Sequence, residues 1–249
     1  MTKYLLIDGD SLAYMSMNSD TFEDATSYID NLIYDMLLAN KCNKYHIFLS
    51  RSSFRKEIST IRTYKGNRKR VDNVFLPSLL KYIEVEHKGI SLNKLEADDL
   101  VCYFKNKDPE NSIICSIDKD VLKQIPGNHY NYRTKEIVKT TPWGSIFFLW
   151  KQVLMGDSTD NIVGIPKIGD KKSTKILSGI TKERELYEEV LKEYINYYGQ
   201  IKGINFFNET LNLVYLLKTD EDMMSRIDDL PELSEGRDVE IHKEIIDLI

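Results

Sequence analysis

The sequence predicts an α/β protein in which helices flank a largely parallel central sheet and a helical C-terminal lobe follows. Short apolar runs at residues 3–8, 46–50, 112–118 and 129–133 are typical of buried strands. Segments with helical apolar spacing separate these runs, and this alternation favours a parallel sheet that is covered on both faces. The strand pattern ends near residue 146, after which only helices are expected.

The helices follow from apolar periodicity and local end signals. Residues 22–40 place apolar side chains on one helical face, and Pro77 suits the first turn of a helix over residues 75–85. The remaining helices are expected at residues 95–106, 146–155, 172–178, 184–199 and 206–217.

These elements divide the chain into two expected domains. Residues 1–145 form the α/β domain, which includes a basic segment at about residues 51–75. Residues 146–249 form the helical lobe, which includes a hairpin motif at about residues 157–180. The acidic stretch 220–249 is expected to form a short helix or a tail.

Composition indicates a soluble globular protein in a reducing compartment. The 249 residues are 42% hydrophobic and 29% charged, and no apolar stretch approaches the length of a membrane span. No leader pattern opens the chain, and the three cysteines are too widely spaced for a disulfide framework or a zinc site. We expect a cytoplasmic protein without membrane contact.

The net charge of −5 conceals two basic segments. Residues 51–70 hold eight Lys or Arg against one acid, and residues 166–182 hold five lysines against one acid. The acids of the chain must therefore be concentrated elsewhere, and their positions are informative.

Eight acidic residues form four clusters. They end the first strand, open the helix in LEADDL, follow the third strand in SIDKD and lie in GDSTDN: Asp8; Glu96, Asp98 and Asp99; Asp118 and Asp120; Asp157 and Asp160. Carboxylates beside apolar segments are costly without cations, and sites made only of carboxylates select hard ions such as Mg²⁺ or Mn²⁺. So many acids favour two ions about 3.5–4 Å apart, an arrangement that serves in-line attack on a phosphodiester.

Simpler interpretations stay open. Asp157 and Asp160 can share one cation if they lie at helical i, i+3 spacing, but GDSTDN is also typical of a surface turn. Glu96 would equally stabilise a helix N-terminus without a metal. The spacing does not decide whether Asp98 or Asp99 lies closer to an ion.

The segment GIPKIG at residues 164–169, followed by DKKSTKIL, predicts the hairpin of a helix-hairpin-helix. Backbone N–H groups in such a hairpin, with the following helix N-terminus, hold a phosphate without reading the base. A plain Gly/Pro turn between packed helices is the alternative. The lysines that follow favour phosphate binding.

Five segments in this order resemble the 5′ nuclease family, which includes flap endonucleases, the 5′ nuclease domain of bacterial DNA polymerase I and bacteriophage 5′–3′ exonucleases. They are IDGDSLAY, YKGNRK at residues 64–69, EADDL, SIDKD and GDSTDNIVGIPKIG. The resemblance spans residues 4 to about 178 and is greatest to a phage enzyme. It implies a PIN-like 5′ nuclease core and metal-dependent hydrolysis of DNA phosphodiester bonds from or near 5′ ends, as a 5′–3′ exonuclease or flap endonuclease in replication or processing.

The resemblance also implies roles for individual residues. The eight acids fall on metal-binding positions for two Mg²⁺ ions, which Mn²⁺ can replace, and the implied catalytic residues are Lys65, Asp8, Asp118 and Asp157. Lys65 matches a basic residue that contacts the scissile phosphate. The implied DNA-binding residues are Arg55, Tyr64, Lys65, Arg68 and Lys69 in an arch region and Gly164, Pro166, Lys167, Gly169, Lys171 and Lys172 at the hairpin.

The implied partners and setting follow from the same family. The hairpin implies a K⁺ site. The expected partner is duplex DNA with a 5′ end or a flap, with RNA–DNA hybrids left open. The protein is expected to be a monomer, in the host cytoplasm if the chain is phage-encoded.

One position departs from the family pattern. Family members usually carry an aspartate at the end of the second strand, where FLSRSSFRKE places Ser50. A hydroxyl adds no charge and is a weak metal ligand, so we expect an active nuclease that needs more Mg²⁺ than a relative with aspartate there. Asp10, two residues beyond Asp8, is an extra acid that would compensate in part.

Two alternative functions are also considered. DGDS, Ser50 and GDSTDN resemble haloacid dehalogenase-type phosphatases, in which the nucleophile, the acid/base, the phosphate ligand and the Mg²⁺ support would be Asp8, Asp10, Ser50, and Asp157 with Asp160. That assignment leaves EADDL, SIDKD, YKGNRK and the hairpin unexplained. The other alternative, a DNA-binding relative with weakened catalysis, conflicts with the many acids, which would repel DNA without metals.

Overall fold

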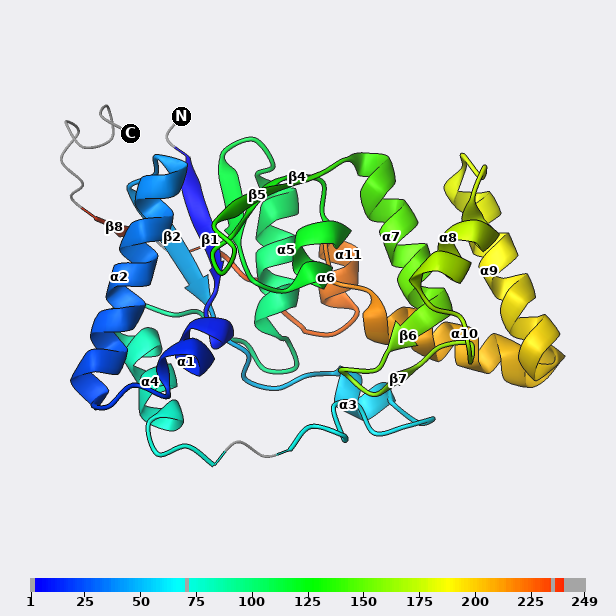
Figure 1. Cartoon of the computed structure of the whole chain (residues 1–249), viewed down its shortest axis with the longest axis horizontal. Helices are drawn as coiled ribbons and strands as arrows, with labels where there is room; N and C mark the ends of the chain where they lie inside the picture. Colours follow the sequence, from blue (N-terminus) through cyan, green and yellow to red (C-terminus); the bar gives the residue numbers. More distant parts are fainter. Residues whose placement is uncertain (1–2, 70–71, 234–235, 240–249) are drawn as a thin grey trace. The chain divides into compact units, whose positions relative to one another are not determined.

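The computed structural model describes residues 3–69, 72–233 and 236–239, which form two compact units (Figure 1). Unit 1 comprises the described residues of Met1–Ser53, Val71–Thr140 and Leu216–Ile249. Unit 2 comprises those of Phe54–Arg70 and Thr141–Tyr215.

The units are discontinuous in sequence, unlike the domains expected at residues 1–145 and 146–249. The basic segment belongs to unit 2, and the chain returns to unit 1 at Leu216. Two buried hydrogen bonds hold this return: the Leu216 N–H donates to Gln124 Oε1 at 3.3 Å, and the Leu217 N–H donates to Asp99 Oδ1 at 3.2 Å. The end of the predicted tail, residues 240–249, lies outside the described residues.

Within its described residues, unit 1 contains a six-stranded sheet with the order β5–β4–β3–β1–β2–β8. Its strands are β1 (Tyr4–Asp8), β2 (Lys44–Phe48), β3 (Ser112–Cys115), β4 (Gly127–Asn131), β5 (Glu136–Thr140) and β8 (Arg237–Asp238). Strands β1 to β4 are parallel, whereas β5 and β8 run antiparallel to β4 and β2. The predicted α/β class with a largely parallel sheet is confirmed.

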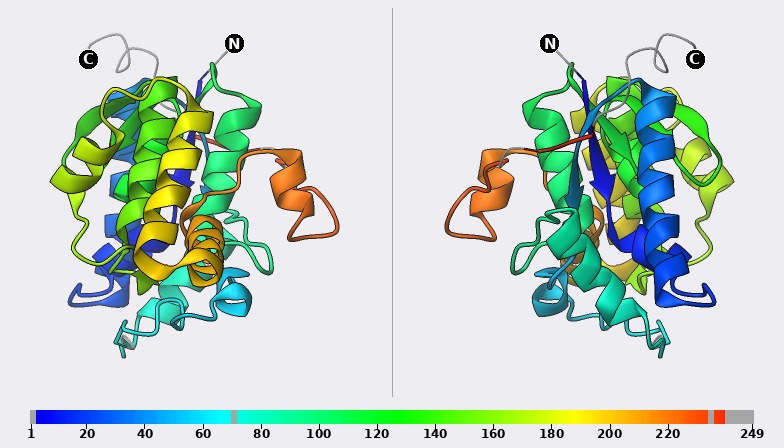
Figure 2. Two further views of the ribbon diagram at one scale, coloured as in Figure 1. Left: turned by 90° about the vertical axis from the view of Figure 1, so that its right-hand side faces the viewer. Right: turned by 90° about the vertical axis from the view of Figure 1, so that its left-hand side faces the viewer.

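Helices cover both faces of this sheet. They are α1 (Asp10–Ser16), α2 (Phe22–Asn40), α4 (Leu76–Glu86), α5 (Ala97–Lys107) and α6 (Lys119–Gln124), while α11 (Asp220–Met224) lies beside α5, where the Tyr103 hydroxyl donates to Asp220 Oδ1 at 2.9 Å. Figure 2 shows β1 between α2 and α5. This layering explains why the central strands β1 and β3 are almost continuously apolar, because each of their faces is buried.

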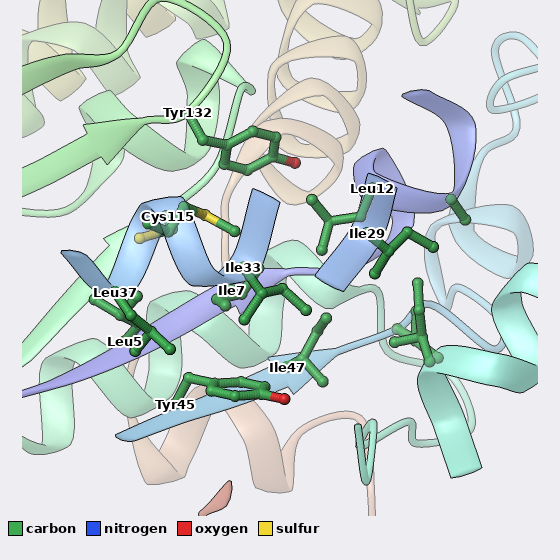
Figure 3. Close-up of a cluster of buried hydrophobic side chains, with 14 of the residues drawn as sticks. Leu5, Ile7, Leu12, Ile29, Ile33, Leu37, Tyr45, Ile47, Cys115 and Tyr132 are labelled. Atoms are coloured by element: carbon green, nitrogen blue, oxygen red, sulfur yellow. The ribbon is translucent and has the colours of Figure 1, made fainter. Parts of the chain in front are cut away.

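The core of unit 1 forms where α2 packs on β1 and β2 (Figure 3). Leu5 and Ile7 of β1 and Ile47 of β2 are fully buried, together with Ile29 of α2. On the other side of the sheet, Phe48 stacks on Phe104 of α5 with ring centroids 5.4 Å apart. Alternate residues of each strand therefore enter the two layers.

Unit 2 is mainly helical. Its elements are α3 (Arg55–Ile58), α7 (Pro142–Met155), β6 (Gly156–Asp157), β7 (Ile162–Val163), α8 (Asp170–Leu177), α9 (Glu183–Tyr198) and α10 (Gln200–Val214). Trp150 of α7 stacks on Phe207 of α10 at 6.2 Å, and the Tyr194 hydroxyl of α9 donates to Val153 O at 2.7 Å. No helix in the described part of the chain has the length and apolar character needed to cross a membrane.

The segment GDSTDN is a β-hairpin and not a helix, so the helical interpretation of its aspartate spacing is wrong. Strands β6 and β7 pair antiparallel. A Cβ on Gly164 would lie 2.1 Å from the Met155 carbonyl carbon, and one on Gly156, whose φ is 67°, would lie 2.3 Å from Gly164 N. The two glycines allow backbones to touch where any side chain would separate them.

Gly164→Ala is expected to lower stability, because its new Cβ would overlap the Met155 backbone. Overpacking of this kind costs roughly 1–3 kcal/mol, and each kcal/mol lowers the thermal midpoint by about 2–4 °C in a chain of this size. Differential scanning calorimetry measures the shift.

Gly169→Ala is the matched control, because the φ of Gly169 is −110° and nothing lies within 4 Å of the position of its Cβ. Its cost should stay below about 1 kcal/mol. Equal losses in the two variants would contradict the close backbone approach at Gly164.

Candidate functional site

The carboxyl ends of β1, β2 and β3 lie at one edge of the unit 1 sheet. The pairing joins Asp8 to Phe48 of β2 and Ile7 to Cys115 of β3. Residues that follow these strands, including Ser50 and Ser116, are therefore brought to the same edge. In open α/β sheets, ligands bind outside the carboxyl ends of the strands.

Asp8 is the buried acid of this edge, with 3% of its surface exposed. Its Oδ2 accepts hydrogen bonds from Ser116 Oγ at 3.0 Å and Ser11 Oγ at 3.2 Å. Burial raises the pKa of Asp8 to about 7, with further contributions from the charges of Asp10 and Asp118. A cation beside Asp8 would offset the cost of keeping this carboxylate charged.

Three supporting residues near Asp8 escaped the sequence analysis. Ser11 and Ser116 donate to its carboxylate, and the Tyr132 hydroxyl donates to its backbone oxygen at 3.3 Å. Serine and tyrosine have no spacing signal of their own here. Only the strand register reveals that Ser116 neighbours Asp8.

Asp118 caps the N-terminus of α6 and is exposed. Its Oδ1 accepts the Asp120 N–H at 2.7 Å, and its own N–H donates to Ser116 Oγ at 3.0 Å. Ser116 therefore ties the start of α6 to Asp8, which fixes the two acids relative to one another.

Ser50 contacts both an acid and a helix start. Its N–H donates to Asp10 Oδ1 at 3.1 Å and Oδ2 at 3.3 Å. Its Oγ accepts the N–H of Ala97, the first residue of α5, at 2.9 Å. Ser50, which follows β2, therefore links Asp10 to the start of α5.

The acids at the start of α5 divide into two kinds. Asp99 is fully buried, and its oxygens accept N–H groups of Glu96 at 3.3 Å and Leu217 at 3.2 Å. Asp99 thus helps to hold this part of the fold together, and its metal ligation stays a prediction. Asp98 is partly exposed, which makes it the better candidate of the pair.

In unit 2, Asp157 and Asp160 lie at the β6–β7 turn. Asp157 Oδ1 accepts the Thr159 N–H at 2.7 Å and so stabilises the turn. The Asp160 carboxylate accepts the Tyr64 hydroxyl at 3.0 Å and forms an ion pair with the guanidinium of Arg68. Lys65 Nζ lies 4.0 Å from the same carboxylate.

Further bonds join residues 63–68 of the basic segment to this turn. The Lys65 N–H donates to Asp160 O at 2.8 Å, Asn67 Nδ2 donates to Ser158 O at 2.7 Å and Asn161 Nδ2 donates to Thr63 O at 2.9 Å. Tyr64 is buried, with 5% exposed. Tyr64 therefore helps to hold the segment on the turn, and its DNA contact stays a prediction.

Arg55, a predicted DNA contact, lies in the interior with 1% of its surface exposed. Its Nε donates to Leu213 O at 2.9 Å, and its Nη2 donates to Tyr215 O at 2.8 Å. The structure assigns this side chain to the packing of α3 on the end of α10. Lys69, in contrast, is exposed.

The GIPKIG hairpin exposes most of the residues predicted to contact DNA. Ile165 and Ile168 point inward and are buried, while the exposed residues are Pro166, Lys167, Gly169, Lys171 and Lys172. No side chain caps the N-terminus of α8, which begins after Gly169. Gly164 has the separate role of close backbone approach described above.

Across the described ranges 3–69, 72–233 and 236–239, no group of three or more His, Cys, Asp or Glu side chains is arranged to hold a metal ion. Mg²⁺ usually keeps several waters and binds through one or two carboxylates plus substrate phosphates. The oxygen-only edge around Asp8 fits such an ion, because it offers carboxylates without a closed cage.

Comparisons with known proteins were made by sequence and by structure. No protein-family model matches the chain. The chain is 30% identical over 216 residues to a 5′-3′ exonuclease of Buchnera aphidicola from Schizaphis graminum, covering 76% of this chain and 74% of that protein. It is 26% identical to DNA polymerase I of Lactococcus lactis, of which it covers 25%.

Solved structures show the same fold. A bacteriophage T5 flap endonuclease in complex with DNA and metal ions aligns with a TM-score of 0.59 and 16% identity, over 85% of this chain and 99% of that one. The catalytic core of Rad2 in complex with DNA substrate aligns with a TM-score of 0.52 and 14% identity, over 88% and 75%.

Arg55→Met should destabilise the protein, because it removes the donors to the buried carbonyl of Leu213 and the partly buried carbonyl of Tyr215. Each unpaired buried carbonyl costs about 1–3 kcal/mol. Lys56→Met, on the exposed side of the same helix, is the matched control and should change stability by less than about 0.5 kcal/mol. Thermal unfolding of both variants tests the assignment, and an unaltered midpoint for Arg55→Met would contradict it.

Proposed function

The chain belongs to the 5′ nuclease family of 5′–3′ exonucleases and flap endonucleases, and we propose that it is a Mg²⁺-dependent enzyme that hydrolyses DNA phosphodiester bonds at or near 5′ ends. The observation that carries the proposal is the buried carboxylate of Asp8 at the carboxyl edge of the sheet, beside Asp10 and Asp118. Such an edge concentrates negative charge where a divalent cation would be bound.

Asp8 and Asp118 would hold the ions in unit 1, together with Glu96, Asp98 and Asp120, and metal ligation by Asp157 stays a prediction. A bound Mg²⁺ supplies Lewis acidity and a water that is activated at neutral pH. Ser11 and Ser116 orient Asp8, because both hydroxyls donate to one of its oxygens. Mn²⁺ is expected to replace Mg²⁺, because it accepts the same oxygen ligands.

Lys65 and Arg68 are proposed to bind the scissile phosphate. The turn that carries Asp160 fixes both side chains, and the Lys65 ammonium lies 4.9 Å from the centroid of the Tyr64 ring. An arginine guanidinium and a lysine ammonium both bind phosphate oxygens. This segment is therefore suited to binding a phosphate near the 5′ end of a DNA strand. Asp160 then positions these cations, and metal ligation by Asp160 stays a prediction.

The hairpin of unit 2 is proposed to anchor duplex DNA through its backbone. The exposed Lys167, Lys171 and Lys172 surround an uncapped helix N-terminus, which suits a phosphate. A K⁺ at this hairpin is part of the same proposal. Unit 1 would thus act as the nuclease core and unit 2 as the DNA-anchoring lobe of a monomeric enzyme.

The phosphatase alternative requires Ser50 to bind a phosphate. Its Oγ accepts the Ala97 N–H instead, and its N–H is bonded to Asp10. The chain also shares its sequence with 5′-3′ exonucleases. A nuclease is therefore the function that the residues support.

Asp118→Asn and Asp157→Asn should each abolish cleavage while DNA binding is largely kept, because a ligand charge is lost and the basic residues stay. The loss should exceed the roughly 10–100-fold cost of removing an outer-shell partner of a metal site. Glu136→Gln, at an exposed position of β5, is the control and should cleave as the wild type does.

The assay uses 5′-labelled duplex DNA, a 5′ flap and an RNA–DNA hybrid, each with Mg²⁺ and with EDTA. Cleavage that persists in EDTA would refute metal dependence. Wild-type turnover in both aspartate variants would refute the ligand assignment.

Replacing Lys171 and Lys172 together with alanine should weaken duplex binding and flatten its salt dependence. Each lost phosphate contact lowers the slope of log K against log salt by about 0.9. The loss should be equal for unrelated DNA sequences, because backbone contacts carry no base information. The control replaces Lys182, the N-cap of α9, and Lys192 within α9 with alanine, because both form exposed ion pairs. An unaltered slope in the Lys171/Lys172 variant would exclude an anchoring role of the hairpin.

A further inference from the structure

Asp10 and Ser50 lie opposite one another beyond the paired ends of β1 and β2. The parallel register joins Asp8 to Phe48, and the Gly9 N–H continues the ladder by donating to Phe48 O at 2.8 Å. Two residues beyond Asp8 and two residues beyond Phe48, the Ser50 N–H donates to both oxygens of Asp10 at 3.1 and 3.3 Å. This two-oxygen contact fixes the plane of the Asp10 carboxylate.

Gly9 makes this approach possible. A Cβ at Gly9 would lie 2.8 Å from both Phe48 O and Ile47 Cγ1. Any other residue would push the continuation of β1 away from β2 and would carry Asp10 out of reach of Ser50. A glycine between Asp8 and Asp10 is therefore needed for Asp10 to reach the Ser50 N–H.

The other side of Ser50 faces α5. Its Oγ accepts the N–H of Ala97, one of the N-terminal donors that a helix cannot satisfy internally. Ala97 lies between Glu96 and Asp98, two of the proposed metal-site acids. One serine thereby joins Asp10 to the helix start that carries these acids.

We propose that Asp10 supplies a carboxylate of the metal site and that Ser50 is a positioning residue that holds Asp10 and the start of α5 together. The inference rests on the proposed function. The carboxylate that the family pattern places after β2 is thus supplied by the segment after β1, two residues beyond Asp8.

A purely structural role is the competing explanation for Asp10. It lies in the first turn of α1, where an acid is stabilised by the helix dipole. Glu23 in the first turn of α2 has the same relation to its own helix and lies at an exposed position. Glu23→Gln is therefore the matched control for loss of a first-turn charge.

The test removes the carboxylate after β1 and introduces one after β2. Mn²⁺ affinity, measured by electron paramagnetic resonance without DNA, should fall about 10-fold in Asp10→Asn. The double variant Asp10→Asn with Ser50→Asp should recover most of this loss, because it returns one carboxylate to the same edge. Glu23→Gln should bind Mn²⁺ as the wild type does.

The positioning role of Ser50 is tested separately. Ser50→Ala keeps the N–H that holds Asp10 but removes the Oγ that accepts from Ala97, so we expect weaker Mn²⁺ binding and a higher Mg²⁺ concentration for half-maximal cleavage. Ser50→Thr keeps the hydroxyl and should restore both values. Circular dichroism of the metal-free proteins checks that each variant is folded.

Asp8→Asn separates failure of this inference from failure of the proposed function. If Asp8→Asn weakens Mn²⁺ binding and Asp10→Asn does not, Asp10 is only a helix-terminal acid and the inference is overturned. If neither variant alters Mn²⁺ binding, the metal site itself is refuted. A double variant that binds no better than Asp10→Asn would also overturn the relocation of the acid.

Discussion

The parallel pairing of β1 with β2 and β3 is the constraint on which the chemistry of unit 1 depends. It places Asp8 between the ends of two neighbouring strands, so that one hydroxyl, that of Ser116, reaches Asp8 and the start of α6. The pairing is in turn secured by burial of both faces of the sheet. The apolar layers exclude water from Asp8 and raise the cost of its charge, which the hydrogen bonds from Ser11 and Ser116 offset in part.

The sequence predicted the elements whose signals are local. Helix α2 has the predicted bounds 22–40, and the four parallel strands lie within about three residues of their predicted positions, because each contributes side chains to the buried interior. The exposed strand β5 was not predicted, since its residues are mostly polar. The short helix α1 was not predicted either, because it begins within DGDS, a sequence typical of turns. The two-residue strands β6 and β7 depend on the close approach of Gly156 to Gly164, which residue spacing in the sequence does not reveal.

Residue roles were harder to predict than elements, because charge alone does not tell which partner a side chain meets. Arg55 and Lys56 are adjacent cations, yet one is buried on two carbonyls and the other is exposed. Asp98 and Asp99 are adjacent acids, and only Asp99 binds the chain returning at Leu217. In both pairs the difference comes from residues more than a hundred positions away. The acids that follow strands were easier, because a strand end in a parallel sheet already defines a site.

The ion pair between Arg68 and Asp160 makes one carboxylate the counter-ion of the proposed phosphate-binding segment. A phosphate that engages Arg68 would release this carboxylate, and a cation that engages Asp160 would release Arg68. Each ligand thus removes the competitor of the other. Thermodynamic linkage then requires the coupling to be reciprocal, so that an anion and a cation would each raise the affinity of the turn for the other.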